Sequence, residues 1–171
     1  MKKANIIGII PARGGSKGVP KKNIQEIGGF PMIAYSIVAG QLSEKIDRCI
    51  VSTDSQEIAD IAKTYGADVP FLRPSEFATD SSTDIEYIKH AIDWFNENEG
   101  YVPEYWVLLR PTTPLREPKV IDKAIEEMIN HLEATSLISI HEFAETPGKM
   151  FGMQDGFLHG LCPMDPRPEY F

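Results

Sequence analysis

The sequence predicts an α/β fold, in which a three-layer, doubly wound and mostly parallel sheet carries helices on both faces. Short apolar segments at residues 5–11, 48–53 and 105–109 are typical of parallel strands that are buried on both faces. Segments with apolar residues at helical spacing alternate with them. The chain has 171 residues, 42% of them hydrophobic and 25% charged, which is enough to bury one core. We therefore expect a single domain over residues 1–171.

The helices are predicted by their apolar spacing and by the residues that begin them. Residues 31–42 have helical spacing, and either Asp54 or Ser55 can cap a second helix. A capping box over residues 83–86 predicts the start of a third helix. Pro118 is a favourable first residue for a fourth. Strands and helices thus alternate, as a doubly wound sheet requires.

The pattern changes after the fourth predicted helix. Residues 136–140 have the composition of a fourth core strand. Two short strand-like segments, residues 149–153 and 157–161, then flank Gln-Asp-Gly, which is typical of a hairpin turn. We expect a hairpin here, after the core of the sheet is complete.

The segment from Ile9 to Asn23 follows the first predicted strand and contains four cations and three glycines. The whole chain carries 25 acidic and 17 basic residues, a net charge of −8, yet residues 5–24 contain no acid. Local positive charge in an acidic protein favours a small anionic ligand over a nucleic acid, which binds through basic contacts spread over a surface. Because ligands lie beyond the carboxyl ends of the strands in such sheets, we predict that this loop binds a polyphosphate.

The residue types of the loop suit this chemistry. Gly14, Gly15 and Gly18 allow backbone N–H groups to approach phosphate oxygens. Arg13 can hold two oxygens with its planar guanidinium, and the lysines supply point charges. The loop has neither the dinucleotide pattern G-x-G-x-x-G nor the P-loop pattern G-x-x-x-x-G-K-[ST]. A glycine-rich turn with solvated lysines is the alternative interpretation.

Other kinds of site find little support in the sequence. Cys49 and Cys162 are too few for a disulfide framework and have no partners at metal-ligand spacing, so we expect buried thiols in a reducing cytoplasm. The four histidines show no ligand spacing either. No apolar segment is long enough for a membrane span, and the N-terminal apolar run lacks the features of a signal peptide.

Four segments, in order along the chain, carry a resemblance to a known family. They are Arg13-Gly-Gly-Ser-Lys-Gly-Val-Pro-Lys-Lys-Asn23, Val51-Ser-Thr-Asp54, Leu72-Arg-Pro-Ser-Glu-Phe-Ala-Thr-Asp80 and Leu109-Arg-Pro-Thr-Thr-Pro-Leu-Arg116. Together they resemble the cytidylyltransferases that activate acylneuraminate and related nine-carbon acidic sugars (nonulosonates), over nearly the whole chain. The resemblance implies a Rossmann-like nucleotide-diphospho-sugar transferase fold. It also implies attack of the sugar's anomeric hydroxyl on the α-phosphorus of CTP, which releases pyrophosphate and forms a CMP-sugar.

The resemblance further implies a role for individual residues. Arg13 and Lys22 match the residues that hold the triphosphate and stabilise the departing pyrophosphate, the catalytic task. The nucleotide-binding residues that it implies are Ala12, Gly14, Gly15, Ser16, Lys17, Asn23, Arg73, Ser81 and Ser82. The residues that it implies to face the acidic sugar are Arg110, Thr112, Arg116 and Lys149.

The resemblance also implies a cofactor and partners. We expect Mg²⁺ and a cytoplasmic homodimer that binds CTP and an acidic sugar, without nucleic acid or membrane. In the family a hairpin arm, here at about residues 141–165, crosses to the second subunit, although its apolar residues could equally belong to the core. The family's magnesium-binding aspartate pair has no counterpart, so we expect a chain truncated at its C-terminus or a metal held differently. Asp54 and Asp80 are the acids that could take part.

Position 110 departs from the family pattern. Sialic-acid enzymes usually carry glutamine before Pro-Thr, whereas this chain carries Arg110. A guanidinium can bind a carboxylate through two hydrogen bonds, which favours a legionaminate-like or pseudaminate-like sugar, unless Arg110 only holds its loop. Two other roles stay open. Asp54 could simply cap its helix, and Arg116 could simply pair with a glutamate, Glu117 or Glu126, on a solvated face.

Overall fold

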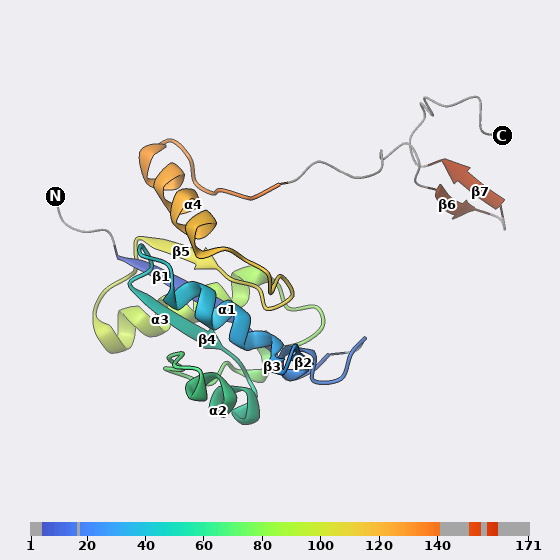
Figure 1. Cartoon of the computed structure of the whole chain (residues 1–171), viewed down its shortest axis with the longest axis horizontal. Helices are drawn as coiled ribbons and strands as arrows, with labels where there is room; N and C mark the ends of the chain where they lie inside the picture. The colour runs from blue at the N-terminus through green and yellow to red at the C-terminus, as the bar shows by residue number, and fades with distance from the viewer. Residues whose placement is uncertain (1–4, 17, 141–150, 155–156, 161–171) are drawn as a thin grey trace. The chain divides into compact units, whose positions relative to one another are not determined.

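The computed structural model of the protein describes residues 5–16, 18–140, 151–154 and 157–160. The chain divides into two compact units, Met1–Thr135 and Ser136–Phe171 (Figure 1). The first unit contains a sheet with its helices, and the second contains a hairpin. The expectation of a single domain over the whole chain stays a prediction.

Three parallel strands form the sheet of the first unit, in the order β4-β1-β5. They are β1 (Ile6–Pro11), β4 (Arg48–Ser52) and β5 (Tyr105–Leu108). On the central strand, Ile9 lies opposite Ile50 of β4 and Leu108 of β5. All residues of β1 except its last are buried, as expected for a strand covered on both faces.

Four helices cover this sheet, and they begin at or near the residues that the sequence predicts as their starts. They are α1 (Met32–Gln41), α2 (Gln56–Thr64), α3 (Asp84–Glu99) and α4 (Pro118–Asn130). Ser55 caps α2 by accepting a hydrogen bond from the Ile58 amide, so Asp54 is not the cap. Thr83 and Glu86 form the predicted capping box at the start of α3.

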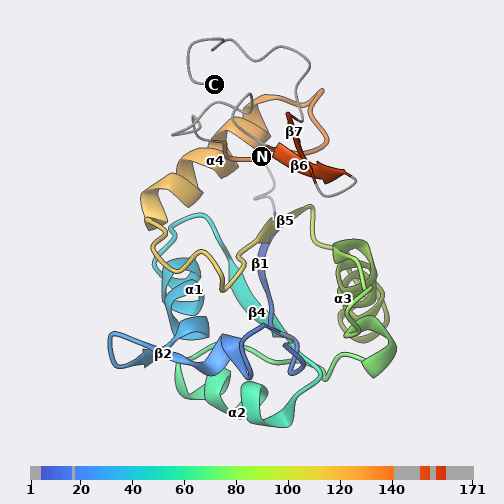
Figure 2. The ribbon, with the colours of Figure 1, turned by 90° about the vertical axis from the view of Figure 1, so that its right-hand side faces the viewer.

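The core lies on both faces of the sheet, because successive residues of β1 point to opposite sides. Ile10 packs in a cluster with residues of α1, α2 and α4, whereas Ile7 and Ile9 pack with residues of α3. Figure 2 shows α1 and α3 on opposite sides of the strands. Burying one such isoleucine contributes about 1.5–3 kcal/mol to folding. The predicted α/β fold with a parallel sheet and helices is therefore confirmed.

Short elements shape the loops at the carboxyl end of the sheet. They are the 3₁₀ turns η1 (Lys22–Ile24) and η2 (Ser75–Phe77) and the strands β2 (Glu26–Ile27) and β3 (Phe30–Pro31). The strands β2 and β3 pair antiparallel across Gly28 and Gly29, whose φ angles of 60° and 88° favour glycine. These elements direct the chain from β1 back toward α1.

Cys49 has the environment expected of a structural thiol. It is buried in the core cluster beside Gly40 of α1, where a Cβ would lie 2.8 Å from the Cys49 Sγ. Burial raises the pKa of the Cys49 thiol to about 12, so the unreactive thiol form dominates. Cys162 lies outside the described residues.

The prediction of a core strand at residues 136–140 is wrong. These residues form no regular structure, and Ile138 and Ile140 are 81% and 91% exposed. Apolar composition alone does not make a strand, because a strand also needs a neighbouring edge to bond its amides and carbonyls. None of the described residues supplies one here.

The second unit contains a short hairpin. Its strands β6 (Phe151–Gln154) and β7 (Phe157–Gly160) pair antiparallel. That this hairpin forms part of a dimerisation arm stays a prediction, and most of the expected arm lies outside the described residues. Within the described ranges, no helix combines the length and apolarity that a membrane span requires.

Candidate active site

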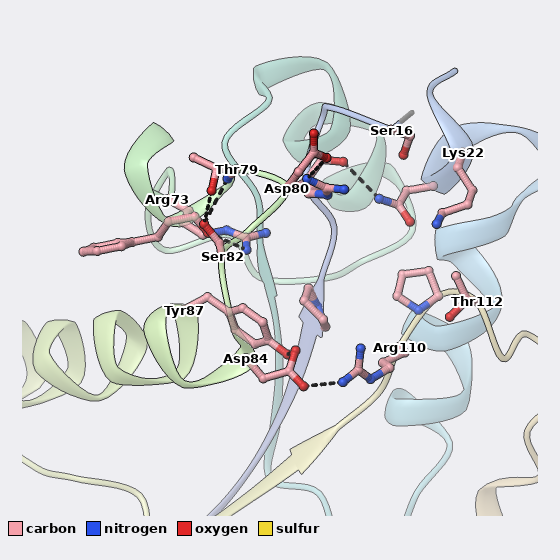
Figure 3. A pocket seen from close by; sticks show the side chains of 15 residues that line it. Ser16, Lys22, Arg73, Thr79, Asp80, Ser82, Asp84, Tyr87, Arg110 and Thr112 are labelled. Carbon is pink, nitrogen blue, oxygen red and sulfur yellow. Dashed lines mark hydrogen bonds and ion pairs between the residues drawn. The ribbon is translucent and has the colours of Figure 1, made fainter. Parts of the chain in front are cut away.

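A pocket of about 230 Å³ lies at the carboxyl ends of the parallel strands (Figure 3). Three segments form its wall: the loop after β1, the segment that leads from β4 to α3, and the loop after β5. The residues that line it are Pro11, Arg13, Ser16, Lys22, Asn23, Arg73, Phe77, Thr79, Asp80, Ser82, Asp84, Tyr87, Arg110, Pro111 and Thr112. Segments far apart in sequence therefore meet where the doubly wound fold places ligands.

The structure brings most of the predicted site residues together. Those that line the pocket are Arg13, Ser16, Lys22, Asn23, Arg73, Ser82, Arg110 and Thr112. Those that are described but do not line it are Ala12, Gly14, Gly15, Ser81 and Arg116. Lys17 and Lys149 lie outside the described residues.

Asp54 fastens the loop after β1 to the end of β4. Its Oδ1 accepts a hydrogen bond of 2.8 Å from the Gly14 amide. Gly14 lies so close to the start of α2 that a Cβ there would be 3.1 Å from the Ser55 Cβ. Close packing rather than a left-handed backbone therefore favours glycine at position 14, and the left-handed residue of this segment is Lys21, with φ at 53°. Of the two roles left open for Asp54, capping is excluded.

Asn23 joins the two ends of the same loop. Its side chain is buried, and its Nδ2 donates to the Arg13 carbonyl at 3.1 Å. Ala12, also buried, extends the pairing of β1 with β4 by donating its amide to the Ser52 carbonyl at 3.0 Å. These bonds fix the backbone on either side of the glycines, so Ala12 supports the loop from beneath.

Two cations of this loop face the pocket. The Arg13 Nη1 lies 2.7 Å from the Asp80 Oδ1. The Lys22 ammonium makes no hydrogen bond or ion pair with the part of the chain that is described, and Figure 3 shows it on the Thr112 side of the pocket. Lys21 instead pairs with Glu57 of α2 at 2.8 Å and does not line the pocket. Of two adjacent lysines, only Lys22 is available to a phosphate.

Arg73 places a buried positive charge at the base of the pocket. It is 5% exposed, and its Nη2 donates to the Ser52 carbonyl at 2.8 Å. Its guanidinium also lies over the Tyr87 ring, 5.1 Å from the centroid. Burial lowers the pKa of Arg73, an effect that Asp54 partly offsets, but arginine remains charged. A buried charge held by carbonyls and a ring, with no carboxylate paired to it among the described residues, favours an anionic or electron-rich ligand.

Ser82 organises the turn that precedes α3. Its Oγ accepts from the Thr79 amide at 3.0 Å and donates to the Glu76 carbonyl at 3.1 Å. Ser81 is exposed and its Oγ lies 3.1 Å from the Thr79 Oγ1, outside the lining. The pair of serines predicted from the sequence thus separates into one pocket residue and one outer residue.

Arg110 forms the opposite wall with two residues that the sequence reasoning missed. Its Nη2 is paired with the Asp84 Oδ2, as Figure 3 shows. The Tyr87 hydroxyl donates to the Asp84 Oδ1 at 2.8 Å. Burial, together with the bond to Asp84, raises the pKa of Tyr87, so its hydroxyl stays a proton donor. A signal for Asp84 and Tyr87 was present in their spacing of three on one helix, but the sequence reasoning used Asp84 only as part of the capping-box segment and gave Tyr87 no role.

Arg116 supports the loop after β5 from outside the pocket. Its Nη2 lies 3.4 Å from the Arg110 carbonyl, and its Nη1 lies 3.5 Å from the Ser36 Oγ. Burial lowers the pKa of Arg116. Glu126 pairs instead with Lys45 at 2.8 Å, and among the described residues Arg116 forms no ion pair with Glu117 or Glu126, so the alternative of a surface pair is wrong.

The lining carries more positive than negative charge. Its charged residues are Arg13, Lys22, Arg73, Arg110, Asp80 and Asp84. Both acids are paired with arginines, so Lys22 and Arg73 are the lining cations that described carboxylates do not pair with. In a chain with a net charge of −8, this excess attracts an anion to one place.

The described carboxylates do not form a magnesium site by themselves. Asp54 accepts from a backbone amide, and Asp80 and Asp84 are each paired with an arginine. Within the described ranges, no group of three or more histidine, cysteine or acidic residues could hold a metal ion. Mg²⁺ normally takes one or two carboxylates along with substrate phosphates, and these acids are already engaged. The Mg²⁺ expected from the resemblance stays a prediction.

Comparison with known proteins shows the family to which the chain belongs. The profile of the cytidylyltransferase family matches residues 7–151, and the chain belongs to that family. It is 39% identical over 142 residues to a CMP-N,N'-diacetyllegionaminic acid synthase of Legionella pneumophila, and the match covers 83% of this chain and 60% of the relative. It is 42% identical over 124 residues to an N-acylneuraminate cytidylyltransferase of Escherichia coli, covering 72% of this chain and 28% of the relative. A pseudaminic acid cytidylyltransferase of Campylobacter jejuni is 34% identical over 135 residues, with 79% and 57% covered.

Solved structures show the same fold. One is a CMP:2-keto-3-deoxy-manno-octonic acid synthetase complexed with CTP, with a TM-score of 0.61 and 19% identity over 74% of this chain and 48% of the other. Another is a 4-diphosphocytidyl-2C-methyl-D-erythritol synthase, with a TM-score of 0.58 and 17% identity over 76% and 56% of the two chains. The matches to the Legionella pneumophila, Escherichia coli and Campylobacter jejuni relatives each cover less than two thirds of the relative's length.

Proposed function

We propose that this protein transfers CMP from CTP to the anomeric hydroxyl of a nine-carbon acidic sugar and releases pyrophosphate. The observation that carries the proposal is the convergence of four cations, from three separate segments, on one pocket of an acidic chain. Membership of the cytidylyltransferase family supports the nucleotide, and relatives named for legionaminic, pseudaminic and N-acylneuraminic acid support the class of sugar.

In this proposal the loop after β1 holds the triphosphate. Arg13 and Lys22 bind phosphate oxygens, and the glycine-rich backbone supplies N–H groups, while Asp54 and Asn23 keep the loop in place. The oxygen of the anomeric hydroxyl forms a bond to the α-phosphorus and releases its proton to solvent, as the bond between that phosphorus and the bridging oxygen breaks. The electron pair leaves with pyrophosphate, whose growing negative charge Arg13 and Lys22 stabilise.

The other two walls hold the remaining parts of the substrates. Arg73 and Ser82, which both line the pocket, bind the cytidine, the role that the resemblance to the family implies for them. Arg110 and Thr112, on the loop after β5, face the acidic sugar. A guanidinium at position 110 suits a substrate carboxylate, since it offers charged donors in a plane.

The test is a release assay with a panel of substrates. The purified protein is incubated with Mg²⁺, each of the four nucleoside triphosphates, and N-acylneuraminic, legionaminic or pseudaminic acid, and pyrophosphate is measured. The Legionella pneumophila relative serves as the positive control. We expect release with CTP and at least one of the three acids, and none with sugar phosphates that lack a carboxylate.

Two other outcomes would contradict the proposal. Binding of CTP by calorimetry, with no product from any acid, would select a nucleotide-binding protein without turnover. Release with a neutral sugar phosphate, or thermal protection by another nucleotide but not by CTP, would select a different nucleotidyltransferase.

The expected assembly and location belong to the same proposal. We propose a homodimer in the cytoplasm, where CTP is available, and Mg²⁺ as the cofactor. Light scattering of the purified protein tests the dimer. Titration of the assay with EDTA tests the need for a divalent cation.

A further inference from the structure

Arg110 is held both at its backbone and at its side chain. Its backbone carbonyl accepts from the Ser36 Oγ at 3.2 Å, and the Arg116 Nη2 lies 3.4 Å away. Ser36 belongs to α1 and is fully buried, so this contact ties the loop after β5 to the core. The guanidinium is paired with Asp84 at the start of α3. The residue thus contacts elements on opposite faces of the sheet.

Asp84 is itself held in a defined orientation. One carboxylate oxygen faces Arg110, and the other accepts a bond of 2.8 Å from the Tyr87 hydroxyl. Tyr87 is 4% exposed, and its ring carries the Arg73 guanidinium. A chain of contacts, Arg110 to Asp84 to Tyr87 to Arg73, therefore joins the two walls of the pocket, as Figure 3 shows for its labelled members.

The pair between Arg110 and Asp84 has little value for folding. The two side chains are 52% and 41% exposed, and exposed ion pairs typically contribute about 0–1 kcal/mol. The pair also uses only one of the three guanidinium nitrogens, since no described residue bonds the Arg110 Nε or Nη1. The contact thus sets the direction of the guanidinium and leaves donors for a ligand in the pocket.

We propose that Asp84 is a positioning residue for Arg110, aimed by Tyr87, and that this pair sets the enzyme's preference for the carboxylate of its sugar substrate. The inference rests on the proposed function and adds the residues that govern the sugar side of it. Asp84 holds Nη2, and the remaining nitrogens bind the substrate carboxylate. Asp84 acts through Arg110 and does not itself touch the sugar.

The test compares Asp84→Asn, Tyr87→Phe and Arg110→Gln with the unchanged protein, using the acid that gives most product in the release assay. Asp93→Asn is the matched control, because it removes a carboxylate from the same helix. It also removes an exposed ion pair, in which the Lys89 Nζ lies 2.5 Å from the Asp93 Oδ2. For each protein, KM for the acid, KM for CTP, kcat and Tm are measured. The double variant that combines Asp84→Asn with Arg110→Gln completes a double-mutant cycle.

We expect Asp84→Asn to raise KM for the acid about five- to twentyfold and KM for CTP less than about twofold, since one charged hydrogen bond no longer aims the guanidinium. Tyr87→Phe gives a smaller change in the same direction, and Asp93→Asn gives none. In the Arg110→Gln background, Asp84→Asn has no further effect on KM for the acid, because the residue on which it acts is absent.

Three results would overturn the inference. A lower KM for the acid in Asp84→Asn would mean that Asp84 competes with the substrate for Arg110. A fall in Tm with both KM values unchanged would mean that Asp84 only supports the helix start. Additive effects in the double variant would mean that the two residues act separately. If the unchanged protein neither turns over nor binds any acid, the proposed function fails, and this inference fails with it. If the unchanged protein is active but Asp84→Asn leaves KM for the acid unchanged, only the inference is refuted.

Discussion

The loops that follow β1 and β5 face the same pocket but bring different numbers of cations to it. In both loops side chains fix the backbone, and one arginine is paired with an acid, Arg13 with Asp80 and Arg110 with Asp84. The loop after β1 adds Lys22, whose ammonium makes no hydrogen bond or ion pair with the described residues. The difference indicates that the first loop works through two cations together, and the second through the direction of one cation.

The largest expected effect tests the cations of the first loop. Arg13→Ala removes a charge that stabilises the departing pyrophosphate, so kcat falls about 10²- to 10³-fold in the pyrophosphate assay. Lys21→Ala is the control, because Lys21 pairs with Glu57 outside the pocket, and it changes kcat less than about twofold. Equal losses in the two variants would show that the loop acts through its overall charge.

A smaller effect tests the backbone support. Asp54→Ala removes the acceptor of the Gly14 amide, and we expect kcat/KM for CTP to fall about 10-fold or more, with a loss of about 1–2 kcal/mol in the free energy of unfolding. Asp54→Asn keeps an acceptor oxygen and is less damaging. Asp60→Ala is the control, because Asp60 lies on α2 and bonds only to the exposed Gln56 among the described residues. If Asp54→Ala matches this control in urea melts and kinetics, the loop does not depend on its support.

The smallest effect concerns the wall between the two loops. The centroid of the His90 ring lies 4.6 Å from that of Phe71 and 5.9 Å from that of the pocket residue Phe77. The His90 Nδ1 is buried without a hydrogen-bond partner among the described residues. Burial, reinforced by the charge of Arg73, lowers the pKa of His90 below its ordinary value of 6.5. The unfolded chain therefore takes up this proton first as pH falls.

The contribution of neutral His90 to stability is thus complete above about pH 6.5 and declines as pH falls below it. We expect Tm to drop between pH 7.5 and pH 5.5, and to drop less in His90→Phe, which keeps a ring but cannot be protonated. Scanning calorimetry at the two pH values measures the difference. The same drop in both proteins would assign it to other groups.

The elements of the fold were largely predictable because their signals are local. A continuous apolar run such as Ile6 to Ile10 indicates a strand buried on both faces, and the capping box at Thr83 marks a helix start. Residues 136–140 were predicted wrongly by the same reasoning, because a strand depends on a pairing edge that composition does not reveal. The site loops were also predictable, since each follows a strand at the edge where ligands bind.

The supports of the site were not predictable in the same way. The sequence left the role of Asp54 evenly open between a helix cap and a site residue, and only its hydrogen bond to the Gly14 amide, 40 residues away, shows that it holds the loop. Asp84 was assigned to a helix start and Tyr87 to no role, whereas the fold pairs Asp84 with Arg110, 26 residues away in the sequence, and with Tyr87. Contacts of this kind join segments whose separation carries no local pattern.

By itself, the sequence determined the α/β fold, the cationic and glycine-rich character of the loop after the first strand, and the family, because these follow from residue types and spacing within short segments. The tertiary structure alone decided which cations face the pocket, which acids hold them, and that Lys21 pairs with Glu57 whereas Lys22 lines the pocket. The physical reason is that hydrogen bonds and ion pairs act over a few ångströms in space, and chain folding chooses which distant side chains come that close.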